Sequence, residues 1–99
     1  MSRALDTEEI ARQLVPLAGW TGDGTGLRCS YTAPSFLGGV QLVTDVAEVA
    51  EEMDHHPDID IRWRTVSFFL VTHSAGGVSQ LDIEFAHRIA ALADAHGAV

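Results

Sequence analysis

The sequence contains no lysine, and this absence narrows the range of partners. Its 6 basic residues are all arginine and stand against 14 acidic residues, so the net charge is −8. A nucleic-acid partner would require a basic surface, and we therefore expect no direct contact with DNA or RNA. Cysteine is nearly absent too. Cys29 has no second cysteine with which to form an internal disulfide or a cysteine-based zinc cluster, which favours a structural role for it.

Long apolar runs are also missing. None approaches the roughly 20 residues of a membrane-spanning helix, and no secretory signal pattern follows Met1. We therefore expect a cytoplasmic protein with no membrane contact. Aromatic residues make up only 7% of the chain, yet 46% of its 99 residues are hydrophobic. That is enough for a core, so we expect a single domain over residues 1–99.

Two segments in the first half of the chain have helical patterns. Asp6 and Glu9 form a capping box for a helix that should end near Pro16, because proline lacks the donor that an interior turn needs. Pro34 is expected in the first turn of a second helix, which must end before Pro57. The second helix is apolar over so wide an arc that one sheet face should not cover it, which suggests another contact surface.

Strand patterns fill the remaining segments. The glycine-rich stretch 20–31 indicates a hairpin between a strand near Trp20 and one at 27–32, rather than a phosphate loop, since no lysine follows it. Residues 59–64 alternate between apolar and polar, which predicts a strand with one buried face. We expect a turn near 64–65, followed by a more central strand over the β-branched and aromatic run 66–73.

The third helix completes the predicted order. Ser79 and Asp82 form its capping box. The sequence thus predicts helix, two strands, helix, two strands, helix. Paired strands with short connections are typical of an α+β fold in which three helices pack on one face of a four-stranded antiparallel sheet.

Polar side chains should converge where the second helix and the last strand end. They are Glu51, Asp54, His55, His56, His73 and Asp82. Histidine has an ordinary pKa of about 6.5, which suits proton transfer near neutrality, and a neighbouring carboxylate fixes its tautomer. Two other interpretations stay open. Each histidine could have a structural role only, for example by interacting with a helix dipole. Alternatively, the three could bind zinc, although residues adjacent in sequence, such as His55 and His56, rarely coordinate one ion together.

The same residues resemble a known family. The run 51–58 (EEMDHHPD), followed by Trp63, the THSAGG run at 72–77 and Asp82, is similar to the signature of the pterin-4a-carbinolamine dehydratases. The resemblance extends over most of the chain without an evident gap. Ile59 and Ala33 depart from it, because aromatic residues are common there in the family.

The resemblance implies an activity and a set of site residues. The activity is dehydration of 4a-hydroxytetrahydropterin to quinonoid dihydropterin, which recycles tetrahydrobiopterin for aromatic amino acid hydroxylases without metal or cofactor. His55 and His73 would transfer protons and His56 would mainly orient the pterin. The residues implied in substrate binding or in holding the histidines are Glu51, Asp54, Pro57, Trp63, Thr72, Ser74, Ala75 and Asp82.

The family also implies partners. Its members form dimers through the sheet and tetramers through helices, so we expect a homodimer and consider a homotetramer. The alternative function is a non-catalytic interaction protein of the same fold, either a dimerisation cofactor of a transcription factor or an assembly factor.

Overall fold

Four strands form one antiparallel sheet in the order β1-β2-β4-β3. The computed structural model describes residues 3–99. The strands are β1 (Thr21–Asp23), β2 (Gly26–Thr32), β3 (Asp58–Arg62) and β4 (Thr65–Leu70). β4 lies between β2 and β3, as its β-branched and aromatic composition predicts.

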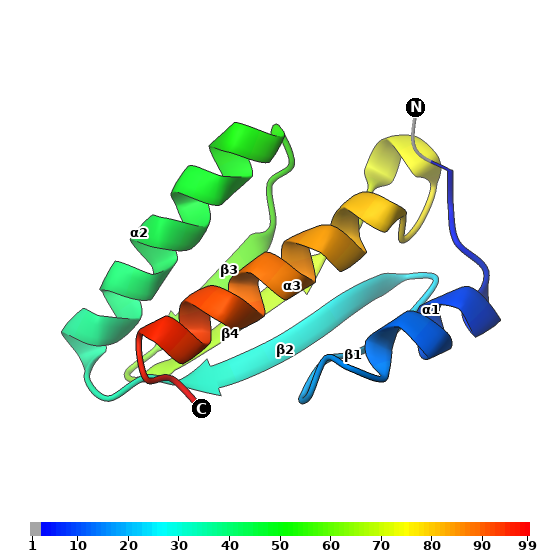
Figure 1. Cartoon of the computed structure of the whole chain (residues 1–99). Helices are drawn as coiled ribbons and strands as arrows, with labels where there is room; N and C mark the ends of the chain where they lie inside the picture. Colours follow the sequence, from blue (N-terminus) through cyan, green and yellow to red (C-terminus); the bar gives the residue numbers. More distant parts are fainter. Residues whose placement is uncertain (1–2) are drawn as a thin grey trace.

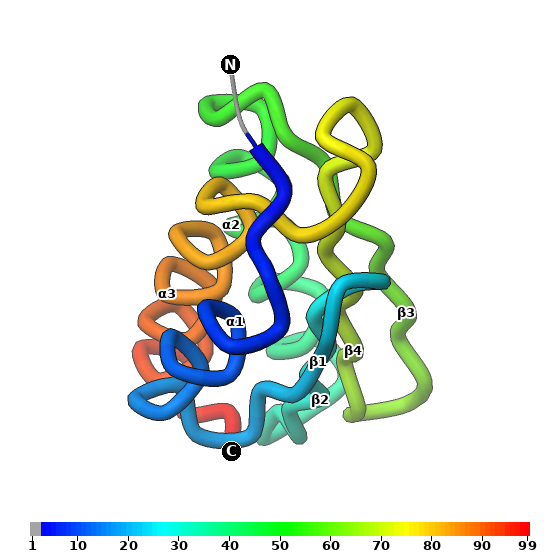
Figure 2. Tube along the Cα trace, turned by 90° about the vertical axis from the view of Figure 1, so that its right-hand side faces the viewer, coloured from blue at the N-terminus to red at the C-terminus, as the bar shows by residue number. Residues whose placement is uncertain are grey.

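Three helices cover one face of this sheet, and the other face is left open (Figures 1 and 2). They are α1 (Thr7–Leu14), α2 (Phe36–Met53) and α3 (Gln80–Ala95), and a 3₁₀ turn, η1 (His73–Ala75), follows β4. The order and the α+β class predicted from the sequence are confirmed. No helix within residues 3–99 is long and apolar enough to cross a membrane.

The core lies between the helices and the covered face of the sheet. Alternate strand residues point into it, so Val66, Phe68 and Leu70 of β4 are buried, and Ile83 and Phe85 of α3 are buried with them. Cys29 belongs to the same core, and burial raises the pKa of its thiol. This environment agrees with the structural role expected for it.

The helix starts follow their capping residues. Asp6 accepts a hydrogen bond from the Glu9 amide in the predicted capping box, and α3 has the predicted box of Ser79 and Asp82. The prediction for Pro34 is wrong. Ser35 is the N-cap of α2 and accepts from the Gly38 amide, so Pro34 lies outside the helix.

The β3–β4 hairpin turns one residue earlier than predicted. Arg62 pairs with Thr65, which leaves Trp63 and Arg64 in the turn and makes the predicted turn at 64–65 wrong. Trp63 has φ 51° and is 73% exposed, so it does not share the half-buried face of the strand. The prediction was wrong because alternation of apolar and polar residues does not show at which residue a strand ends and a tight turn begins.

Candidate active site

The three histidines lie at one end of the sheet. The antiparallel pairing of β3 and β4 places the segment before β3 close to the segment after β4. His55 and His56 precede β3 and His73 follows β4, while Asp58 of β3 lies opposite Phe69 of β4. The chain leaves α2 through Asp54, which adopts a left-handed conformation with φ 50°, and the His55 amide donates to the Ala50 carbonyl (3.0 Å). This cap directs the chain from the helix toward the sheet.

Asp82 is the centre of a buried hydrogen-bond network. Its side chain is 0% exposed, and Oδ1 accepts from His55 Nε2 at 2.6 Å. Oδ2 accepts from Thr72 Oγ1 (2.7 Å) and from the Ser79 amide (2.9 Å). One carboxylate therefore joins the end of α2, the end of the sheet and the start of α3.

This network assigns the tautomer of His55. A carboxylate only accepts hydrogen bonds, so Nε2 must carry the proton that it shares with Asp82. Nδ1 is then the nitrogen that can accept a proton when the ring is neutral. The ring is 12% exposed and lies 6.2 Å from that of Phe85, between centroids, so its orientation is fixed by packing as well.

His56 has a different environment. Its Nε2 lies 2.5 Å from Glu51 Oε2, but both side chains are mostly exposed, at 57% and 77%. Solvent screens a pair of this kind, so it orients the ring with little gain in stability. His56 is therefore positioned at the rim of the site, with its Nδ1 edge free of this carboxylate.

His73 lies beside a hollow of about 390 Å³. It is exposed in η1, and the hollow runs between the β1–β2 turn and the loop after β4. Gly24, Thr25, Phe69 and Val71 contribute to its walls. A planar ring that enters this hollow would contact His73 directly.

Most of the residues predicted for the site lie in segments near this end of the sheet, where hydrogen bonds join His55, Asp82 and Thr72 and, separately, His56 and Glu51. Two chain segments and one helix start supply them: Glu51, Asp54, His55, His56 and Pro57; Thr72, His73, Ser74 and Ala75; and Asp82. Trp63 does not join them. It lies beyond the far end of β3. The 5 residues of this strand, at about 3.3 Å each, separate Trp63 from the histidine end of the sheet by roughly 17 Å. Within one chain, a substrate held by the histidines would not reach Trp63.

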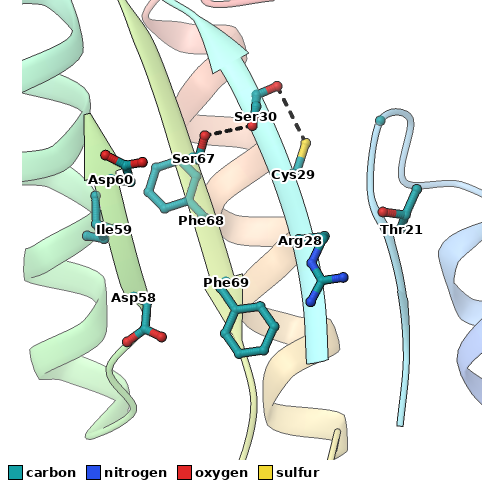
Figure 3. Close-up of a pocket in the computed structure, with 11 residues that line it drawn as sticks. Thr21, Arg28, Cys29, Ser30, Asp58, Ile59, Asp60, Ser67, Phe68 and Phe69 are labelled. Carbon is teal, nitrogen blue, oxygen red and sulfur yellow. Dashed lines mark hydrogen bonds between the residues drawn. The ribbon is translucent and has the colours of Figure 1, made fainter. Parts of the chain in front are cut away.

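Phe69 is not among the residues predicted for the site from the sequence. Figure 3 shows its ring on the open face of the sheet, between Asp58 and Arg28, which lie opposite it on the two neighbouring strands. A second hollow, of about 510 Å³, extends from Phe69 across this face. The period-two pattern of β4 could have placed Phe69 on the open face, but it could not have identified the neighbours across the strands.

The sequence leaves zinc binding by the three histidines open as an interpretation. Among residues 3–99, no group of three or more histidine, cysteine, aspartate or glutamate side chains is placed to hold a metal ion.

Comparisons with known proteins show which family the chain resembles. Residues 3–92 match the family described as pterin 4 alpha carbinolamine dehydratase. A Mycolicibacterium smegmatis protein with the provisional name pterin-4-alpha-carbinolamine dehydratase is 51% identical over 85 residues, which cover 86% of this chain and 90% of that protein. A similarly named Mycobacterium avium protein is 54% identical over 85 residues, with the same coverage.

Solved structures show the same fold. A transcriptional coactivator/pterin dehydratase from Brucella melitensis superposes with a TM-score of 0.87 at 30% identity, over 92% of this chain and 99% of that one. A pterin dehydratase-like protein described as a RuBisCO assembly factor in the alpha-carboxysome gives 0.62 at 24% identity, over 75% of this chain and 86% of that one, and supports the fold alone. The α+β fold with histidines at one sheet end thus defines a pterin dehydratase-like domain. The chain belongs to the pterin 4 alpha carbinolamine dehydratase family.

Proposed function

We propose that this protein dehydrates 4a-hydroxytetrahydropterins to quinonoid dihydropterins by acid–base catalysis with histidine. The observation that carries the proposal is the placement of His55 and His73 at one end of the sheet, with His55 locked to a buried carboxylate. Family membership supplies the substrate class.

The reaction needs two proton transfers and no redox step. The C4a–O bond breaks with its electron pair on oxygen, and an imidazolium protonates this oxygen so that it leaves as water. The neighbouring ring nitrogen supplies the electron pair of the new carbon–nitrogen double bond and releases its proton to a neutral imidazole. Positioned acid–base groups of this kind contribute about 10²–10⁴-fold each.

The two proton-transfer roles fall to His55 and His73. His55 would act through Nδ1, because Asp82 holds Nε2. His73 is exposed beside the hollow, where the bound ring can reach it. His56, paired with Glu51 at the rim, would orient the pterin, while Asp54, Pro57, Thr72, Ser74 and Ala75 would shape the pocket around it. The pterin is the substrate, and the proposed reaction uses no cofactor.

Steady-state kinetics on freshly generated 4a-hydroxytetrahydropterin tests these roles. We expect His55→Ala and His73→Ala to lower kcat by 10²-fold or more, and His56→Ala mainly to raise KM. His87→Ala is the matched control, because this histidine is exposed on α3, outside the site. If the His55 and His73 variants match the control, the acid–base assignment is wrong. A wild-type protein without dehydratase activity would favour the non-catalytic interaction protein.

We further propose that the protein is a homodimer, with the homotetramer as the second possibility, and that it acts in the cytoplasm to recycle tetrahydrobiopterin. A sheet-mediated dimer would use an outer strand, β1 or β3. Helix-mediated association into the tetramer is supported by the start of α2, where Phe36, Leu37 and Val40 are exposed although the same helix buries Leu42 and Val46. Apolar side chains grouped in this way mark contact surfaces.

A further inference from the structure

In the described part of the chain, residues 3–99, the buried polar and charged residues form a single cluster. They are Thr72, Ser79 and Asp82, which are 4%, 0% and 0% exposed. Burying a polar group costs free energy unless the group is hydrogen-bonded. In the proposed dehydration the Asp82 carboxylate holds His55, but neither hydroxyl group has a task. The presence of two buried hydroxyls directly behind the histidine site therefore needs a separate explanation.

The identity of the partners fixes the direction of each hydrogen bond in this cluster. Thr72 Oγ1 lies 2.7 Å from Asp82 Oδ2 and 2.7 Å from Ser79 Oγ. A carboxylate only accepts, so the single hydroxyl proton of Thr72 points to Asp82, and Ser79 must donate its own proton to Thr72. Ser79 Oγ in turn accepts from the Leu81 amide at 3.3 Å. Neither hydroxyl has a proton left for a substrate, so the side chain of Thr72 acts inside the protein.

The backbone of Thr72 holds the turn that carries His73. Thr72 and Gly77 form a β-bridge across the base of this turn, in which the Thr72 amide donates to the Gly77 carbonyl at 3.0 Å. Gly77 also lies close to the β1–β2 turn, because a β-carbon at this position would be 2.9 Å from the Gly24 carbonyl oxygen. The base of the turn is thus held from two sides, and the hydroxyl of Thr72 connects it to Asp82.

We propose that Thr72 is a positioning residue that links the two histidines of the proposed proton transfer. Its hydroxyl holds the Asp82 carboxylate, which binds His55 Nε2, and its backbone carries the turn with His73. One side chain thus sets the two imidazoles relative to each other. This placement matters because both rings must lie within hydrogen-bond reach of one substrate. The inference rests on the proposed function, in which both histidines act on the same molecule.

The test compares replacements of Thr72 that remove or keep the hydroxyl. Thr72→Val keeps the shape of the side chain without the hydroxyl, Thr72→Ala is a second hydroxyl-free variant, and Thr72→Ser restores the hydroxyl. Ser79→Ala is the matched control, because it weakens the cap of α3 but leaves the bond from Thr72 to Asp82 in place.

Steady-state kinetics gives the first readout. We expect Thr72→Val and Thr72→Ala to lower kcat about tenfold with KM nearly unchanged, the equivalent of one hydrogen bond to a charged group. Thr72→Ser should stay within about threefold of the wild-type kcat. Ser79→Ala should do so as well, although its midpoint of urea unfolding falls.

Hydrogen exchange gives a second readout that needs no substrate. The Ala75 and Gly76 amides each donate a hydrogen bond of 3.0 Å within the turn, so their exchange rates report how firmly the turn is held. Thr72→Val should raise the exchange rates of these amides and of the His55 Nε2 proton about tenfold. Thr72→Ser and Ser79→Ala should leave all three rates near those of the wild type.

The two readouts separate failure of this inference from failure of the proposed function. If the wild type has no dehydratase activity but exchange responds as expected, the proposed function fails and the link between the histidines stands. Wild-type exchange rates in Thr72→Val would overturn the link, whatever its kcat. Equal losses in Ser79→Ala and Thr72→Val would also overturn it, because Thr72 would then act through stability alone. A raised KM with unchanged kcat in Thr72→Val would instead assign the side chain to substrate binding and overturn its positioning role.

Discussion

Replacing Asp82 by asparagine should separate the two tasks of its carboxylate, which are to hold His55 and to cap α3. Asparagine keeps the shape, and its amide oxygen can still accept from the Ser79 amide and Thr72 Oγ1. Its amide nitrogen then faces His55 Nε2 as a donor, so the ring must switch its proton to Nδ1. That switch removes the free acceptor nitrogen that the proposed proton transfer requires.

The magnitudes follow from the network. We expect Asp82→Asn to lower the free energy of unfolding by about 1.5–3 kcal/mol, the range for a hydrogen bond to a charged group. Asp82→Ala should cost more, roughly 3–5 kcal/mol, because the Ser79 amide and His55 Nε2 lose their buried partner. The asparagine variant should also lose about 10²-fold or more in kcat.

Three measurements check this account. Urea unfolding gives the stability difference, kinetics gives kcat, and ¹⁵N chemical shifts of the His55 ring report its tautomer. Glu84→Gln, an exposed change on the same helix, is the control for loss of an acidic group. The reasoning is refuted if Asp82→Asn keeps wild-type kcat, or if its His55 retains the proton on Nε2.

Further predictions concern stability, metal dependence and assembly. Trp63→Gly should raise the free energy of unfolding by about 1 kcal/mol, because glycine adopts φ 51° without strain, and it should leave kcat/KM unchanged; a loss of activity would show that Trp63 meets the substrate. The hydrogen bond from Arg3 lowers the pKa of Glu9 to about 2, so its contribution to stability should be complete above about pH 4.5 and fade as the pH falls toward 2; Glu9→Gln should flatten this part of the pH–stability curve. Dialysis against a chelator should leave activity intact, and stoichiometric zinc with chelator-sensitive activity would contradict that expectation. Light scattering at micromolar concentration should give at least twice the 10.6 kDa monomer mass, and Leu37→Ser on α2 should shift any tetramer toward the dimer; a monomer that persists on tenfold concentration would rule out the proposed association.

Sequence patterns predict the elements of this fold because each has a local physical signal. Capping residues mark the starts of α1 and α3, and β-branched and aromatic residues mark β4 as central. The errors occur where local signals end. Trp63 continues an alternating pattern, but the hairpin places it in the turn, since the register of β3 against β4 depends on pairing along both strands.

The candidate site divides in the same way. The histidines and the carboxylates near them could be predicted to converge, because helix ends and strand ends are visible in the sequence. The carboxylate that pairs with each histidine could not be predicted. Asp82 lies 27 residues beyond His55 and yet holds it, while the nearer Glu51 pairs with His56. Phe69 gains its place beside both hollows only through strands that are distant in the chain.

Asp82 shows why a structural and a functional interpretation of one residue need not compete. From the sequence it is the capping-box partner of Ser79, and the structure confirms that bond. The cap uses only one side of one oxygen, which leaves the rest of the carboxylate for Thr72 and His55. Since the cap buries and orients the carboxylate, the His55 ring is held by the same interaction that starts α3. A substitution of Asp82 that frees His55 must therefore also weaken α3, so it should lower stability and activity together. A substitution of His73 should lower activity alone, because His73 is exposed and lies outside this network.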